Sequence, residues 1–276
     1  MNKYRKRTLL YDVIGVIVAL ALFAVPFVFM LFNSLKNRKE ANLLKMSIPT
    51  EPVWGNYYEI IQANDFQIIT AFKNSLSIMV LSVIILVITA SMAGYILQRY
   101  QGKAKDTFSM IFLLGLMLPP AILPTIWVLQ SLHIYKSLFS IVMIEVALQL
   151  PFTIMLYRGY MNTIPRELEA AGYIDGCTKW KVFTKIVFPL LKPVTATIVI
   201  LNAVTIFNDF MNPLYFFPGK DNVTVQLTLY NYMGRFSSSH NLLFANAIVI
   251  TVPMLILFLI FNKRIVEGMA SGSVKG

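Results

Sequence analysis

The sequence is organised around one polar stretch, Pro165-Arg-Glu-Leu-Glu-Ala-Ala-Gly-Tyr-Ile-Asp-Gly-Cys-Thr-Lys-Trp-Lys-Val-Phe-Thr-Lys-Ile-Val-Phe-Pro189, in an otherwise apolar chain. Pro165 suits the first turn of a helix, because its missing N–H would have no intrahelical partner there. Asp175-Gly176 is typical of a helix stop, since glycine takes positive φ without strain. Thr178 can cap a second helix, whose apolar residues recur on one face: Val182, Phe183, Ile186, Val187 and Leu190. The stretch therefore predicts two short helices that form a docking element.

The composition is that of an integral membrane protein. The 276 residues are 57% hydrophobic and only 13% charged, whereas soluble domains carry about 25% charged residues. The net charge of +11 would suggest nucleic-acid binding in a soluble protein. In a membrane protein, the accumulation of basic residues on the cytoplasmic side explains it better. We therefore expect a multi-pass membrane protein that binds no nucleic acid.

Six apolar runs are long enough to cross a bilayer, which requires about 20 residues. They cover approximately residues 13–32, 75–97, 108–132, 138–157, 194–217 and 243–261. If the N-terminus lies inside, the cytoplasmic segments hold 16 of the 24 Lys and Arg residues in dense groups. This asymmetry predicts both termini inside and a cytoplasmic loop at 163–190, between spans four and five. The expected fold is an all-α membrane protein with one transmembrane domain over residues 1–276.

The sequence lacks the residues that an enzyme or a nucleotide site would need. The single cysteine, Cys177, excludes an internal disulfide and a cysteine-based metal cluster, and His133 and His240 are far apart. There is no G-x-x-x-x-G-K-[ST] loop to bind ATP and no G-x-S-x-G nucleophile motif. We expect no catalytic residue, no metal site and no cofactor held by this chain.

Polar residues recur within two of the apolar runs. Span five carries a series at intervals of three to four residues, which would share one helix face: Asn202, Thr205, Asn208, Asp209 and Asn212. Span four contributes Glu145 and Gln149. Ionisable residues within a span are functional hypotheses by default, although such groups also form structural hydrogen bonds between helices. Amides and an acid suit a hydroxyl-rich ligand, so these seven residues are candidates for a translocation path.

The polar stretch resembles the cytoplasmic coupling motif of ABC importer permeases, which reads E-A-A, three residues, G, nine residues and I-x-L-P. Nine residues separate Gly176 from Ile186, and Pro189 completes the motif with Phe188 at the leucine position. The resemblance implies that Gly176 forms the turn of the motif. It also implies that the second helix is a strut into the membrane.

The first half of the motif departs from this pattern. Counting back from Gly176, the E-A-A positions fall on Ala170, Ala171 and Gly172, and Glu169 stands one place earlier. Members of the family often carry a glutamate at that earlier position as well. By this resemblance, Glu169 is the acidic contact with an ATPase, and Asp175 precedes the turn.

Further segments resemble the maltose-type, MalG-like carbohydrate importer permeases: Asn74-Ser75, Pro119-Pro120 with Pro124, Leu150-Pro151-Phe152, residues 208–214 and the terminal residues 268–276. Phe207 stands where the family often has tryptophan before Asn-Asp. The resemblance extends over nearly the whole chain. It implies a bacterial-type plasma or inner membrane and ATP-driven import of a sugar, which we expect to be an oligosaccharide.

The resemblance also implies a set of partners. A second homologous permease would complete the path, two ATPase subunits would consume ATP and Mg, and an extracytoplasmic sugar-binding protein would deliver the ligand. Two alternatives stay open: an importer of glycerol-phosphate esters or another polar solute, and a membrane transporter or enzyme acting alone. Phosphate would favour Arg or Lys on the path, and the polar series of span five contains neither.

Overall fold

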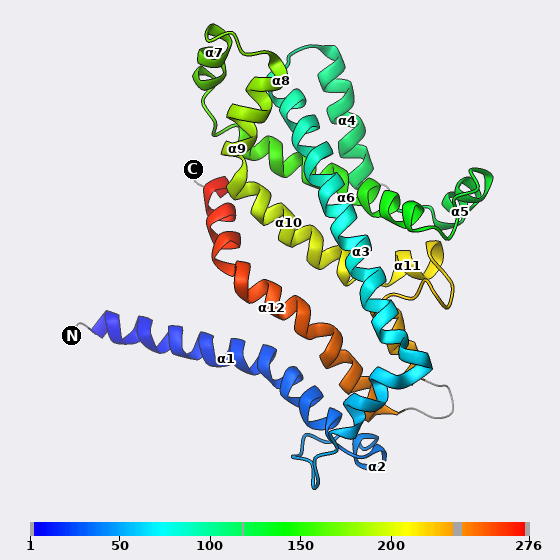
Figure 1. The fold of residues 1–276 in the computed structure, drawn as a ribbon. Helices are drawn as coiled ribbons and strands as arrows, with labels where there is room; N and C mark the ends of the chain where they lie inside the picture. The colour runs from blue at the N-terminus through cyan, green and yellow to red at the C-terminus, as the bar shows by residue number, and fades with distance from the viewer. Residues whose placement is uncertain (1–2, 118, 234–238, 274–276) are drawn as a thin grey trace. The chain divides into compact units, whose positions relative to one another are not determined.

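All regular elements in the described part of the chain are helices, as the sequence predicts. The structure, a computed structural model, describes residues 3–117, 119–233 and 239–273 (Figure 1). The chain forms two compact units, one of residues 1–69 and 227–253 and the other of residues 70–226 and 254–276. Helices α3 (Gly55–Arg99) and α12 (His240–Ser273) contribute to both units.

The first unit contains α1 (Lys3–Ser34), α2 (Arg38–Ala41), the start of α3, most of the 3₁₀-helix η2 (Gln226–Tyr232) and the first half of α12. One buried amide joins three of its segments. Asn56 Nδ2 donates to Ser34 O at 2.7 Å and Lys36 O at 2.9 Å, while Asn56 Oδ1 accepts from Asn241 at 2.9 Å. These bonds satisfy carbonyls at the end of α1 that have no intrahelical partner.

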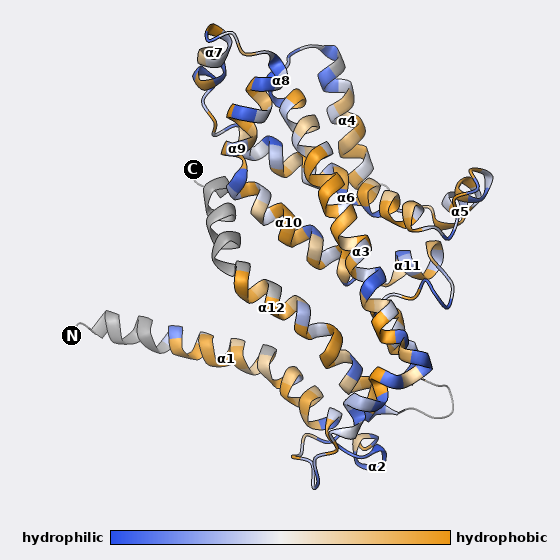
Figure 2. Ribbon diagram, in the orientation of Figure 1, coloured by the Kyte–Doolittle hydropathy of each residue, from blue (hydrophilic) through white to orange (hydrophobic). Residues whose placement is uncertain are grey.

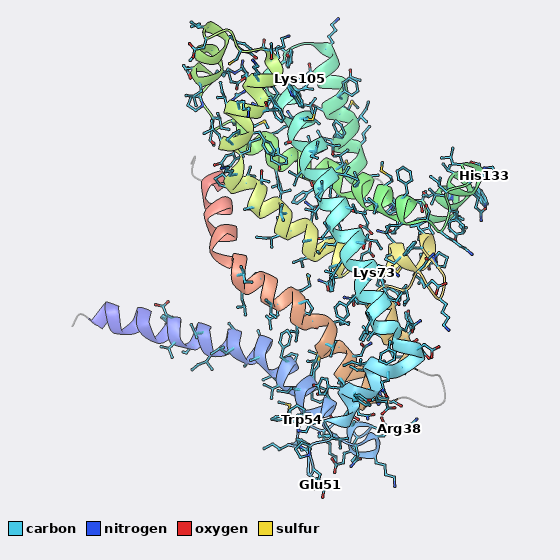
Figure 3. All side chains as sticks on the ribbon, in the orientation of Figure 1. Arg38, Glu51, Trp54, Lys73, Lys105 and His133 are labelled. Carbon is cyan, nitrogen blue, oxygen red and sulfur yellow. The ribbon has the colours of Figure 1, made fainter. Side chains whose placement is uncertain are left out.

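The second unit contains most of α3, then α4 (Lys103–Met117), α5 (Ile122–Ser131) and α6 (Leu138–Met161). It continues with α7 (Glu167–Ile174), α8 (Lys179–Lys181), the π-helix η1 (Val182–Val187), α9 (Phe188–Leu190), α10 (Lys192–Phe207) and α11 (Met211–Phe216). Figure 2 shows mainly hydrophobic residues along α10 and the middle of α3, and hydrophilic residues at α8. Lys105, near the start of α4, lies at the end of this unit that carries α7 and α8 (Figure 3).

A buried core joins the helices of the second unit that support the 163–190 segment. It includes Tyr95 of α3, Tyr157 of α6, Phe183 of η1 and Ile198 of α10. The backbone of α3 approaches α6 closely at Gly94, where an added Cβ would lie 3.0 Å from the Tyr157 Cβ. The segment is thus packed onto the helix bundle by its own apolar residues.

Within the described residues, four helices are long and apolar enough to cross a membrane: Tyr11–Ser34, Gly55–Arg99, Leu138–Met161 and His240–Ile260. Two bent pairs raise the number to six if each is one span. These pairs are Lys105–Met117 with Ile122–Ser131, bent by 116°, and Lys179–Leu190 with Lys192–Phe207, bent by 74°. Four to six spans are consistent with the expected architecture, while the six boundaries and the orientation stay predictions.

Two of the expected spans are divided in the structure. The run at 108–132 forms α4 and α5, separated around Pro119-Pro120, because proline has no N–H to continue the helical bonding. The run at 194–217 forms α10 and α11, separated at residues 208–210. The prediction that the polar residues of span five share one continuous helix face is therefore wrong.

Candidate functional site

The segment predicted to couple the protein to a partner, residues 163–190, begins with α7 and a tight turn. Helix α7 ends at Ile174, and Gly176 has a φ of +76°. The N–H of Gly176 donates to Tyr173 O at 3.1 Å, and the N–H of Cys177 donates to Gly172 O at 2.9 Å. This pair of bonds is a Schellman motif, which needs a left-handed residue where glycine stands. The predicted stop at Asp175-Gly176 is confirmed.

The second arm of the segment begins at the predicted cap. The Thr178 side chain accepts from the N–H of Lys181 at 3.4 Å, and α8 leads into the π-helical turn η1. Pro189 follows this turn; it has no N–H, and its ring crowds the carbonyl of Lys185 four residues earlier. A widened π turn just before the proline accommodates that missing bond. Val182, Phe183 and Val187 are buried, as their spacing predicts, while Leu190 is 41% exposed.

The two arms touch at Gly172 and Ile186. A Cβ added to Gly172 would lie 2.5 Å from Ile186 Cδ1 and 3.4 Å from Val182 Cγ2. Gly172, at the second alanine position of the E-A-A pattern, is buried, whereas Ala170 and Ala171 are exposed. The absence of a side chain at residue 172 thus permits the close packing of α7 on η1.

Gly172→Leu is expected to lower the free energy of unfolding by about 1–3 kcal/mol, because the larger side chain overpacks this contact. Gly172→Ala is expected to be close to neutral, since Ile186 Cδ1 is a flexible chain end and alanine favours the helix by about 1 kcal/mol. Thermal unfolding of the purified chain in detergent measures both. Adding Ile186→Ala should restore much of the stability lost in Gly172→Leu; a failure to do so would contradict the contact.

Glu169 lies inside the chain rather than on its outer surface. Its carboxylate Oε1 is 2.6 Å from Arg99 Nε, and both side chains are only 8% exposed. Tyr95 donates its hydroxyl to Glu169 Oε2 at 2.9 Å, and Arg99 Nη2 donates to Ile164 O at 3.0 Å. The acid that the resemblance assigned to an ATPase contact therefore fastens α7 to the end of α3 in this structure.

Apolar side chains are exposed on the coupling segment. Ile174, the last residue of α7, is 86% exposed, and Leu168 and Trp180 are 43% and 60% exposed. Asp175, beside the turn, is exposed as well. Exposed apolar groups that are rimmed by polar residues are a feature of protein interaction sites.

A second group of polar residues lies where α6 meets the break between α10 and α11. Glu145 of α6 is fully buried. Asn212 Nδ2 donates to Glu145 Oε1 at 3.2 Å and also to Asp209 Oδ2. Asp209 Oδ1 accepts from the N–H of Met211 at 2.8 Å and from the N–H of Asn212. One amide therefore bridges two carboxyl groups, and Asp209 satisfies the first two N–H groups of α11, which have no intrahelical partner.

The other predicted path residues lie elsewhere. Asn202 is buried between α10 and α6, where its Nδ2 donates to Ile198 O at 2.9 Å and to Thr153 Oγ1 at 3.3 Å. Thr205 and Asn208 are exposed, and the Asn208 amide accepts from Gln226. Gln149 is partly buried. The structure thus brings together Glu145, Asp209 and Asn212, and gives Asn202 a bonding role between helices.

The sequence reasoning missed Arg99, Tyr95 and Thr153. In the sequence, Arg99 lies just after the apolar run 75–97, and Tyr95 lies within that run. Each lies on a different helix from its partner, so helical spacing within one segment contains no signal for these contacts. A buried acid in a membrane protein does predict a nearby cation or donor, but it does not say which one.

Comparisons with known proteins find relatives over nearly the whole chain. Residues 87–271 match the family model described as "Binding-protein-dependent transport system inner membrane component". The probable ABC transporter permease protein YurM of Bacillus subtilis (strain 168) is 33% identical over 255 residues, covering 92% of this chain and 84% of YurM. The melibiose/raffinose/stachyose import permease protein MelC of the same organism is 31% identical over 266 residues, covering 95% of each chain.

A solved structure shares the fold. One chain of the crystal structure of a bacterial ABC transporter involved in the import of the acidic polysaccharide alginate superimposes with a TM-score of 0.82. The match covers 95% of this chain and 98% of that chain, at 18% sequence identity. At this identity the likeness is one of fold, and it includes the all-helical architecture described above.

Proposed function

The chain belongs to the family of binding-protein-dependent transport system inner membrane components, and on that premise we propose that it carries an oligosaccharide into the cytoplasm. It is a multi-pass cell-membrane protein and a permease subunit rather than an enzyme, since its relatives are ABC transporter permeases. The energy for transport comes from two ATPase subunits, which use ATP and Mg. A second permease chain completes the path, and an extracytoplasmic binding protein delivers the sugar.

The observation that carries the ATPase-coupling proposal is the combination of a rigid turn and exposed apolar side chains. The Schellman turn and the Thr178 cap satisfy the backbone of the segment internally. Ile174, 86% exposed at the end of α7, has no apolar cover within the described residues. A cleft on an ATPase subunit would bury this side chain and Leu168. Glu169 supports the docking from within by holding α7 in place.

The proposed cargo rests on named relatives and on the chemistry of the polar residues. MelC is an import permease for melibiose, raffinose and stachyose, and the structural neighbour belongs to an alginate importer. All four imported materials are carbohydrates with many hydroxyl groups. In this chain, Thr205 and Asn208 are exposed polar groups near the break that contains Asp209. Amides, hydroxyls and an acid match such a ligand, because they both donate and accept hydrogen bonds.

Ile174→Asp is expected to weaken the association with the ATPase subunits by about tenfold or more, because a charge replaces an apolar group that is desolvated on docking. The tagged chain is co-expressed with the products of its neighbouring genes, and ATPase recovery is measured after purification. Ile48→Asp is the matched control, since Ile48 is 76% exposed and lies between α2 and α3.

Uptake tests the other half of the proposal. Proteoliposomes that contain the assembled complex should accumulate oligosaccharide only when ATP, Mg and the binding protein are supplied. Uptake by the purified chain alone would contradict the importer proposal. Equal ATPase recovery with Ile174→Asp and wild type would contradict the docking proposal.

A further inference from the structure

Two clefts adjoin at the end of α3, beside the coupling segment. One has a volume of about 360 Å³ and the other about 290 Å³, and both are lined by Tyr95, Tyr100 and Lys179. Both lie within the second compact unit. They start where the apolar sequence of a membrane-spanning helix gives way to Arg99 and the loop that follows. At the end of a spanning helix, side chains pass from the hydrocarbon to the headgroup layer.

The larger cleft is positively charged. Among the described residues that line it, Arg99, Arg166 and Lys179 are cationic, and Glu169 is the only acid. The Glu169 carboxylate is already paired with Arg99. Arg166 and Lys179 are exposed, and neither forms an ion pair with a carboxylate in the described part of the chain. Two positive charges therefore remain to attract an anion.

These two cations are held near the cleft by neighbouring groups. Lys179 Nζ lies 5.3 Å from the centroid of the Tyr100 ring, a cation–π contact. Arg166 Nη2 donates to Gln98 O at 3.4 Å, which leaves the rest of its five-donor guanidinium available. Such a guanidinium suits the oxygens of a phosphate group.

The smaller cleft is largely apolar. Met92, Ile96 and Phe183 line it together with Trp180, whose side chain is 60% exposed. Trp and Tyr are enriched at membrane interfaces, where an apolar ring body and a polar edge are both accommodated. A ligand that fills both clefts must therefore have an anionic head and an apolar tail in direct succession.

We propose that the paired clefts bind one anionic phospholipid, with its phosphate between Arg166 and Lys179 and its upper acyl chain against Met92, Ile96 and Phe183. Basic pockets between spanning helices are suited to lipid head groups. Free phosphate would use only the charged cleft. An acidic side chain from a protein partner would likewise leave the apolar cleft unfilled. The continuity of the two clefts favours the lipid.

Trp180 provides a direct probe of the apolar cleft. The full chain contains three tryptophans, so Trp54→Phe and Trp127→Phe together leave Trp180 as the only emitter. This chain is reconstituted in vesicles of equal parts phosphatidylcholine and phosphatidylglycerol, with bromine on the acyl chains of one lipid or the other. The quenching of Trp180 fluorescence by each brominated lipid gives the relative association constants of the two lipids. These constants are expected to favour phosphatidylglycerol by at least about fivefold, which corresponds to the attraction of about one positive charge.

Charge-matched variants decide whether the preference belongs to this site. Arg166→Gln with Lys179→Gln should abolish the preference, and Arg166→Lys with Lys179→Arg should keep most of it. Lys181→Gln with Lys185→Gln removes the same charge from exposed residues of the same segment that line neither cleft. This control should leave the preference unchanged.

Four outcomes would overturn the proposal. These are equal quenching by both brominated lipids, an equal loss in the control variant, displacement of the lipid by inorganic phosphate, and loss of the preference when the ATPase subunits bind. The last result would identify the cleft as a protein contact. None of them depends on the sugar, so the oligosaccharide proposal stands or falls separately.

Discussion

Glu169→Ala is expected to destabilise the folded chain by about 3 kcal/mol, because it leaves the buried Arg99 guanidinium without its carboxylate. This value is at the lower end of the range for a broken buried pair, since the adjoining cleft gives water some access to Arg99. The change should appear as a lower melting temperature of the purified chain in detergent. Glu167→Ala, which removes an exposed acid from the same helix, should change stability by less than about 0.5 kcal/mol.

A double substitution separates an internal ion pair from an ATPase contact. Arg99→Leu with Glu169→Leu replaces the pair by apolar groups and should recover most of the stability lost in either single variant. An ATPase contact predicts the opposite pattern: Glu169→Ala would keep its melting temperature and lose ATPase recovery. That result would show that the ion pair contributes little to holding α7.

Asn212→Asp is expected to cost about 3 kcal/mol or more, because it removes the donor from two acidic side chains, and each group left unsatisfied in a buried contact costs about 1–3 kcal/mol. It also places a third carboxyl group beside Glu145 and Asp209, which Asn212 bridges in the structure. The yield and melting temperature of the purified chain should both fall. Transport by the assembled complex should fall with them.

Moving the amide to the other side of the contact provides the control. In the double variant Asn212→Asp with Glu145→Gln, the new glutamine can donate to the new aspartate, so the bond between residues 145 and 212 is restored in reverse while the bond to Asp209 stays lost. This variant should be more stable than Asn212→Asp alone. If both are equally unstable, the contact between residues 145 and 212 does not explain the loss.

Local structure could be predicted from the sequence because its signals lie within a few residues of each other. The stop at Gly176, the cap at Thr178 and the buried positions Val182 and Phe183 all follow from turn chemistry and helical spacing. The structure confirms these predictions, because each feature is determined by residues that are neighbours along the chain. The resemblance to importer permeases rested on the same residues, and the family match confirms it.

Tertiary contacts and helix breaks could not be predicted in this way. The partners of Glu169 lie on α3, and nothing in their own segment marks them as its neighbours. The series from Asn202 to Asn212 has helical spacing, yet Asp209 bonds the N–H groups of α11 and thereby competes with a continuous helix. Short polar side chains can thus replace a helical hydrogen bond of the backbone. Packing against α6 decides between a continuous helix and a break.

The internally bonded turn of the coupling segment has a consequence for how tightly a partner can bind. Fixing the backbone of one residue costs about 1–2 kcal/mol in conformational entropy. A flexible loop would incur that cost when it binds its partner. Here the bonds of Gly176 and Cys177 to α7 incur it during folding instead. The segment is preorganised, so in the proposed docking the burial of Ile174 would contribute to affinity with little loss to ordering. A preorganised segment can also transmit the movement of a bound partner to the helices without first becoming ordered.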